Sequence, residues 1–219
     1  MAKQLHTMFT LRAIVIIVGL FSLIMLAGFY FYSQSTQSVL NTTYNHLETI
    51  TEIKSKQIQE WYKDEQLDAK TISNNPFLQN ILFAFFENPS PQIIHELETY
   101  LNYIEIEHGL LGIYIINDKR QVLLETKTGN DKIICDKHSI TGTKDSVMNT
   151  VIHYDKETHS YAINFLYPIH YKDSLYFIVF QHNVNSFLFP LVALWPNESQ
   201  SSETYIIQKE EDSVFVLNM

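Results

Sequence analysis

The 219-residue sequence has very few of the residues that crosslink or interrupt a fold. Cys135 is the only cysteine, so an intrachain disulfide is excluded and the fold must depend on a hydrophobic core. We interpret Cys135 as a small hydrophobic side chain rather than a reactive thiol. The six glycines are scattered along the chain and do not form a glycine-rich phosphate-binding loop.

Positive charge is also scarce. The chain has 15 Lys and Arg residues against 24 Asp and Glu residues, which gives a formal net charge of −9. A surface with this balance is repelled by phosphate backbones. Nucleic acid is therefore not expected as a partner.

Charge of either sign is absent from residues 13–32, AIVIIVGLFSLIMLAGFYFY. A helix of this length covers roughly the 30 Å of a bilayer's hydrocarbon core. Its Leu, Ile, Val and Phe side chains contribute about −5 kcal/mol towards insertion. A cleaved signal peptide is a poor match, because the run is long and no Ala-x-Ala-like site follows it. The segment is predicted to be an uncleaved transmembrane helix in contact with membrane lipid.

The charges beside this segment predict its orientation. Lys3 and Arg12 precede it, whereas the first acidic residue, Glu48, lies well beyond it. By the positive-inside rule, residues 1–12 form a cytoplasmic tail. We expect a single-pass protein of the inner (plasma) membrane, with residues 33–219 periplasmic or extracellular.

Residues 33–72 lack both Pro and Gly, and their apolar residues recur near helical spacing. This pattern predicts a long stalk helix. Lys54 and Lys56 fall where apolar residues are sparse, so most sides of the stalk should be wet there. A homodimer partner or the chain's own domain could cover the remaining apolar seam.

Two shorter helices are predicted after the stalk. Pro76 ends the stalk, and 77–87 is apolar on nearly all sides, which indicates a buried helix. Ser90 is a suitable N-cap for a further helix that Gly109 ends.

The residue pattern then changes to that of β-strands, rich in β-branched and aromatic residues. Neighbouring hairpins after a block of helices are typical of an α+β fold, with an antiparallel sheet of about five strands and helices on one face. We expect a short apolar helical segment next, followed by a polar linker and a last hairpin (203–208 and 213–218). The five predicted strands are 111–117, 121–125, 147–154, 161–167 and 175–181.

Catalytic and metal-binding patterns are weak. His153, Asp155 and His159 are close in sequence, but the chain has no HExxH motif and no paired Cys and His ligand spacing. We expect these three side chains to be solvent-facing, and we predict no metal site, cofactor or catalytic residue. A nucleophile elbow of the GxSxG type is also missing.

Polar aromatic side chains on the sheet are the better candidates for binding a ligand. Alternation places Tyr161 on one face of its strand and Asn164 on the other. Tyr114, Tyr154, Tyr161 and Asn164 are the candidate ligand-binding residues, although packing in the core or on the surface is the alternative for each tyrosine. A strand twist or bulge would be needed to bring all four together.

Four segments together resemble a known family. They are the N-terminal anchor, the helix with IKSKQIQEW (53–61), the hairpin with GIYIIND (112–118), and the strand ending LYPI (166–169). These features resemble the extracytoplasmic double Cache sensors of bacterial receptors, including PAS-containing sensor histidine kinases and diguanylate cyclases. The most specific likeness is the join FLFPLVALWP (187–196), followed by ETYIIQ and VFVLN, between the two lobes of such sensors.

The resemblance implies a PAS-like membrane-distal lobe (73–196) that binds a small extracellular ligand. A signal would then pass along the stalk (33–72) to an output domain. The sequence departs from the family here, because we expect 197–219 to be a linker and only the first hairpin of an incomplete membrane-proximal lobe, with neither a second transmembrane helix nor a kinase. We therefore expect no enzyme activity in this chain.

Three functions stay open at this point. The first is the sensing domain of a membrane-anchored signal-transduction receptor. The second is a membrane-anchored structural or assembly protein that acts through its stalk and the edge strand of its last hairpin. An exported, anchored enzyme is the third.

Overall fold

The computed structural model describes residues 2–126, 140–141, 147–150, 152–155, 159–194, 205–210 and 213–217. Cys135, most of the polar loop predicted after Thr126 and the linker predicted at 195–202 lie outside these residues. The chain divides into two compact units, Met1–Ile53 and Lys54–Met219.

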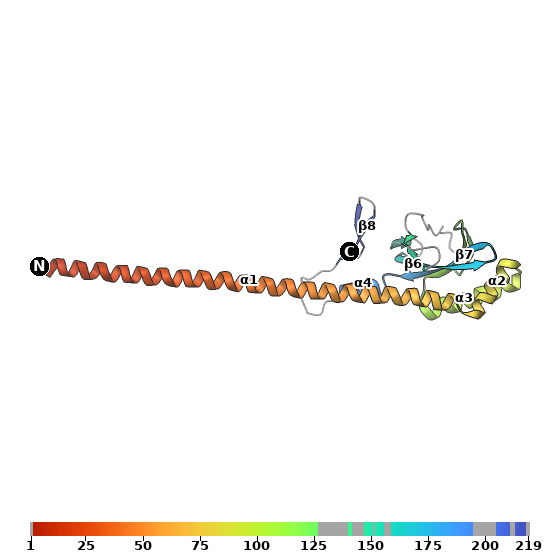
Figure 1. Ribbon diagram of the computed structural model, residues 1–219, viewed down its shortest axis with the longest axis horizontal. Helices are drawn as coiled ribbons and strands as arrows, with labels where there is room; N and C mark the ends of the chain where they lie inside the picture. The colour runs from red at the N-terminus through yellow and green to blue at the C-terminus, as the bar shows by residue number, and fades with distance from the viewer. Residues whose placement is uncertain are drawn as a thin grey trace. The chain divides into compact units, whose positions relative to one another are not determined.

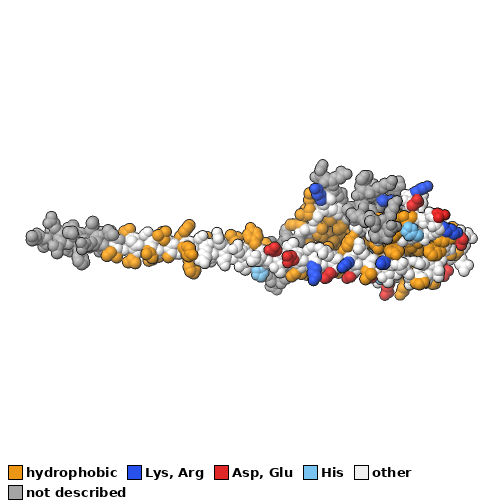
Figure 2. Space-filling view, in the orientation of Figure 1, with side chains coloured by type: hydrophobic (Ala, Val, Ile, Leu, Met, Phe, Trp, Pro, Cys, Tyr) orange, Lys and Arg blue, Asp and Glu red, His pale blue; other side chains and the backbone are white. Residues whose placement is uncertain are grey.

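The first unit consists of the N-terminal part of helix α1 (Ala2–Ser73). The predicted tail, membrane segment and stalk thus belong to one helix without a break. Its side chains from Ile16 to Tyr32 are exposed, and Figure 2 shows hydrophobic side chains along this unit. Among the described residues, α1 is the one helix long and apolar enough to cross a membrane, judged by length and composition.

In the second unit, the remainder of α1 is followed by α2 (Pro76–Glu87) and α3 (Pro91–His108). The Asn75 side chain caps α2, and the Ser90 Oγ accepts a 3.3 Å hydrogen bond from the backbone N–H of Ile93 at the start of α3. Gly109 ends α3 in the left-handed conformation, with φ of 62°. The predicted cap and end of α3 are confirmed, and α2 begins one residue before the predicted range 77–87 and ends where it was predicted to end.

An antiparallel sheet follows, and in the described part of the chain it has seven strands. The order is β2-β1-β7-β6-β4-β3, and β5 also pairs with β6. The α+β fold class is confirmed. The strands are β1 (Gly112–Asn117), β2 (Val122–Glu125), β3 (Ile140–Thr141), β4 (Met148–Thr150), β5 (His153–Asp155), β6 (Ser160–Tyr171) and β7 (Ser174–Asn183).

Each face of the sheet has its own apolar cluster. The larger cluster joins Trp61 of α1 and buried residues of α2, α3 and α4 (Leu188–Ala193) to sheet residues that include Phe165 and Phe180. Figure 1 shows α2, α3 and the adjoining part of α1 on one side of β6 and β7. The smaller cluster lies on the other face and comprises Tyr114, Ile116, Met148, Leu166, Phe177 and Val179.

The prediction of a single strand at 147–154 was wrong. Met148 is paired with Leu166 and Asn149 with Phe165, whereas Tyr154 is paired with Tyr161, so the register shifts by one residue between β4 and β5. A shift of this kind is a β-bulge, which alternation in sequence does not reveal. Strand β3 was also not predicted, because it has only two residues. The last hairpin forms from β8 (Ile207–Glu210) and β9 (Ser213–Val216), and β8 extends two residues beyond the predicted strand 203–208 into the predicted turn.

Candidate functional site

Buried polar side chains gather on the face of the sheet that bears the smaller apolar cluster. The Tyr114 hydroxyl on β1 donates a 3.1 Å hydrogen bond to Oε1 of Gln181 on β7. Gln181 is directly opposite Asn164 of β6, and both are almost fully buried. Directly opposite residues share a face, so the two amides lie on the side where Tyr114 lies. We call Tyr114, Thr150, Asn164 and Gln181 the polar cluster.

The bulge between β4 and β5 determines how Asn164 is bonded. Its backbone N–H donates to Oγ1 of Thr150, at 3.0 Å, because the shifted register interrupts the regular ladder here. Among the residues that the structure describes, none donates a hydrogen bond to the buried Oδ1 atom of Asn164. A buried amide oxygen without a donor costs about 1–3 kcal/mol relative to a bonded one. Asn164 is therefore the member of the cluster with an acceptor to offer a ligand.

A glycine permits the position of the Tyr114 ring. A Cβ atom added to Gly112 would lie 3.0 Å from the Tyr114 hydroxyl and 3.2 Å from two ring carbons. The ring therefore lies across the backbone of Gly112, which is itself paired with Gln181. A larger residue here would require the Tyr114 side chain to shift by a few tenths of an ångström.

The structure separates the four predicted site residues into two pairs. Tyr114 and Asn164 share the face of the polar cluster. Tyr161 lies on the opposite face, where its ring is 5.5 Å from that of Phe189 on α4. Tyr154 is directly opposite Tyr161, with ring centroids 5.4 Å apart, and is half exposed. The bulge does not bring the four together, and ligand binding by any of them stays a prediction.

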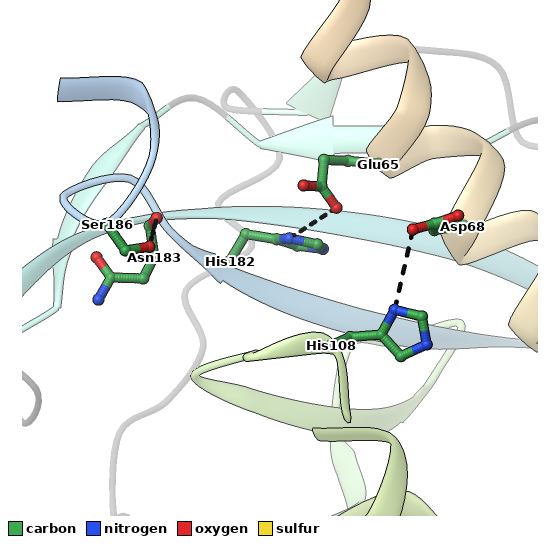
Figure 3. A network of polar contacts seen from close by, with 6 residues as sticks. All are labelled: Glu65, Asp68, His108, His182, Asn183 and Ser186. Atoms are coloured by element: carbon green, nitrogen blue, oxygen red, sulfur yellow. Dashed lines mark hydrogen bonds and ion pairs between the residues drawn. The ribbon is translucent and has the colours of Figure 1, made fainter. Parts of the chain in front are cut away.

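Two histidine–carboxylate contacts lie on the helix-covered face (Figure 3). His182 Nδ1 of β7 is 3.1 Å from Oε2 of Glu65 on α1, and their side chains are only 11% and 23% exposed. His108 Nδ1, at the end of α3, is 3.9 Å from Oδ2 of Asp68 in a more exposed setting. The stick view shows Glu65 and His182 pointing toward one another across the gap between α1 and β7.

Burial shifts the pKa values of both members of the Glu65–His182 contact. Burial, with a smaller contribution from the nearby His108, lowers the pKa of His182 to about 4. Burial also raises the pKa of Glu65, and the neighbouring Asp68 and Asp64 act in the same direction, although a hydrogen bond from Trp61 opposes them. Because the pKa of His182 is about 4, its imidazole is neutral at neutral pH, and the contact with Glu65 is then not an ion pair.

Sequence reasoning missed Gln181, Thr150, Glu65 and His182. Gln181 and Asn164 each interrupt an apolar run, FIVFQHN and YAINFLY, and that interruption was the available signal. The sequence gives no such signal for Glu65, because a carboxylate on a helix is normally solvated. The described residues contain no group of three or more His, Cys, Asp or Glu side chains placed to hold a metal ion.

The structure is similar to sensory domains of bacterial receptors. The ligand-binding domain of the Pseudomonas fluorescens chemoreceptor CtaA, in complex with L-serine, matches with a TM-score of 0.52 and 13% identity, over 80% of this chain and 71% of that domain. The sensor domain of the V. cholerae histidine kinase DctB matches with a TM-score of 0.51 and 16% identity, over 74% and 61%. The sensory domain of the Campylobacter jejuni chemoreceptor Tlp3 gives 0.50 and 15%, over 76% and 68%.

These matches define the fold. No protein-family model matches the sequence, and no curated protein matches it significantly. The chain spans about three fifths of the Tlp3 domain bound to 4-methylisoleucine, 60% of its length. The fold is that of Cache-type sensor domains, which confirms the likeness at the level of the fold. The neighbours are sensory and not catalytic domains.

Proposed function

We propose that this chain is the extracytoplasmic sensing portion of a membrane-anchored signal-transduction receptor, and that a small molecule binds at the polar cluster. The observation that carries the proposal is the unbonded Oδ1 of Asn164, buried beside Gln181 and Tyr114. A ligand with a hydrogen-bond donor would satisfy this oxygen. Met148, Leu166 and Val179 beside the cluster offer apolar contact, the mixture typical of small-molecule sites.

The fold supports the same function. Neighbours with this fold are sensory domains, and the CtaA domain holds L-serine. The low identity carries no ligand over to this chain, so the ligand is proposed only as a small molecule. The output domain that would receive the signal belongs to a longer or separate polypeptide in this proposal.

The membrane arrangement completes the proposal. Residues 13–32 would span the membrane as part of α1, with Lys3 and Arg12 on the cytoplasmic side. Exposed apolar side chains at Val39, Leu40 and Leu47 would support a homodimer through the stalk. Residues 73–196 would form the membrane-distal lobe, and 197–219 would begin a second one.

A thermal-shift screen tests ligand binding. The full chain in detergent is mixed with a broad set of metabolites, and a true ligand raises the melting temperature in a concentration-dependent way. Asn164→Leu should abolish the shift, because it removes the free acceptor, whereas the matched control Asn102→Leu on the exposed side of α3 should retain it. A screen without any shift would contradict the sensing function, and stable stalk-dependent oligomers in that case would favour an assembly role.

A reporter fusion tests the orientation separately. Alkaline phosphatase fused after Met219 should be active, and a cytosolic reporter at the same place should not. The reverse result would place residues 33–219 on the cytoplasmic side and would exclude an external ligand.

A further inference from the structure

At one position along the paired strands β6 and β7, residues of the polar cluster lie on one face of the sheet and residues that contact α1 lie on the other. We call this position the level of the polar cluster. Asn164 and Gln181 are a directly opposed pair on the cluster face. The next residue of each strand, Phe165 and His182, points to the opposite face, because side chains alternate along a strand. A shift of either strand at this level therefore moves both sets of contacts.

On the face toward α1, several rings pack closely together at this level. The Phe165 ring lies 5.3 Å from Tyr62 and 6.5 Å from Trp61, and 5.1 Å from the His182 ring. His182 in turn contacts Glu65, one turn further along α1. Trp61, Tyr62 and Glu65 thus lie within about one turn of α1. The polar Glu65–His182 contact at this level links α1 to the strand that holds Gln181.

We propose that the Glu65–His182 contact couples the polar cluster to α1, so that a change at Tyr114–Gln181 alters how α1 is held against the sheet. This inference rests on the proposed sensing function, for which it names the connection to the stalk. Coupling is reciprocal, so a change at Glu65 alters the cluster equally. The coupling can therefore be measured without any ligand.

A double-mutant cycle in the full chain tests the coupling. Tyr114→Phe removes the hydroxyl that bonds Gln181, and Glu65→Gln removes the charge of the carboxylate that faces His182. Tyr114 bonds Gln181, whereas Glu65 contacts His182, so the two substitutions should have additive effects if the sites are not connected. We expect the unfolding equilibrium constant of the doubly substituted chain to differ at least about fivefold from the additive value.

The matched control is a cycle of Tyr114→Phe with Asp68→Asn. Because Asp68 and His108 also act on the Glu65–His182 pair, a second control cycle combines Tyr114→Phe with Glu60→Gln, an exposed carboxylate of α1 that pairs with Lys56. This cycle should be additive within about twofold. If Glu65→Gln does not fold, His182→Gln replaces it in the cycle.

Amide hydrogen exchange localises the effect. Tyr114→Phe should speed exchange in α1 residues 61–68, and exchange there should not rise further when Glu65→Gln is added. Additivity in the Glu65 cycle, or unchanged exchange in 61–68, would overturn the coupling. A negative ligand screen with a non-additive cycle would instead remove the sensing function and leave the coupling standing.

Discussion

The Lys54 Nζ atom lies 2.8 Å from the carbonyl oxygen of Val192, 138 residues away in the chain. The same ammonium group donates to the carbonyl oxygens of Leu191 at 3.0 Å and Leu194 at 2.5 Å. Its three N–H donors thus match three carbonyls at the end of α4, where a helix leaves such groups unbonded and favours a cation. A lysine in a stalk expected to be wet is instead 8% exposed.

Replacing this lysine should destabilise the second unit. Lys54→Met leaves the carbonyls at the end of α4 without donors, which should cost about 1–3 kcal/mol of unfolding free energy. Urea unfolding followed by Trp fluorescence measures the loss. Lys56→Met is the control, because the Lys56 side chain is 77% exposed and its pair with Glu60 is a surface contact. Equal effects of the two substitutions would contradict a specific role for Lys54.

The acid stability of the chain should depend on His182. Its pKa is about 4 in the folded protein, below the ordinary value of 6.5, so the unfolded chain binds the proton more readily. The contribution of His182 to stability is therefore lost as the pH falls from about 6.5 to 4. Glu65, whose pKa is raised by burial, acts in the opposite sense, since its contribution is lost as the pH rises through its folded value.

Glu65→Gln isolates the histidine contribution. In this variant, stability should fall more steeply than in the wild type between pH 6.5 and 4. Thermal melts across this range provide the measurement. A variant with the same acid profile as the wild type would show that the two groups do not titrate as a buried pair.

The aromatic core between α1 and the sheet should be the most sensitive to truncation. Phe165 is fully buried and touches Trp61, Tyr62 and His182. Phe165→Ala should cost about 3–5 kcal/mol, because it removes a large ring and leaves a cavity. Denaturant unfolding gives the value. A loss below about 1 kcal/mol would mean that α1 is not held by this contact.

Gly112→Ala should disturb the polar cluster more than it disturbs the fold. The added methyl group would meet the Tyr114 hydroxyl at 3.0 Å, so the ring that bonds Gln181 must shift by a few tenths of an ångström. We expect a loss of about 1–3 kcal/mol from overpacking, together with loss of any ligand-induced rise in melting temperature. Gly28→Ala, which meets no atom within 4 Å and lies inside helix α1, is the control and should neither lower the stability nor remove the ligand-induced rise.

Local features of this fold were predictable from sequence, and pairings over long distances were not. Ser90 and Gly109 mark the ends of α3 because caps depend on a few adjacent residues. Alternation placed Tyr161 and Asn164 on opposite faces correctly. The bulge before β5, the Tyr114–Gln181 bond and the position of Lys54 depend on segments far apart in sequence, so no local pattern indicates them.

The most direct test of the central claim is side-chain amide NMR of Asn164 and Gln181 during titration with a compound that raises the melting temperature. We predict that the Asn164 and Gln181 signals shift with the same saturation curve as the melting temperature, while the Asn102 amide stays unchanged. A compound that stabilises the chain and binds tightly, but leaves both cluster amides unshifted, would contradict binding at the polar cluster.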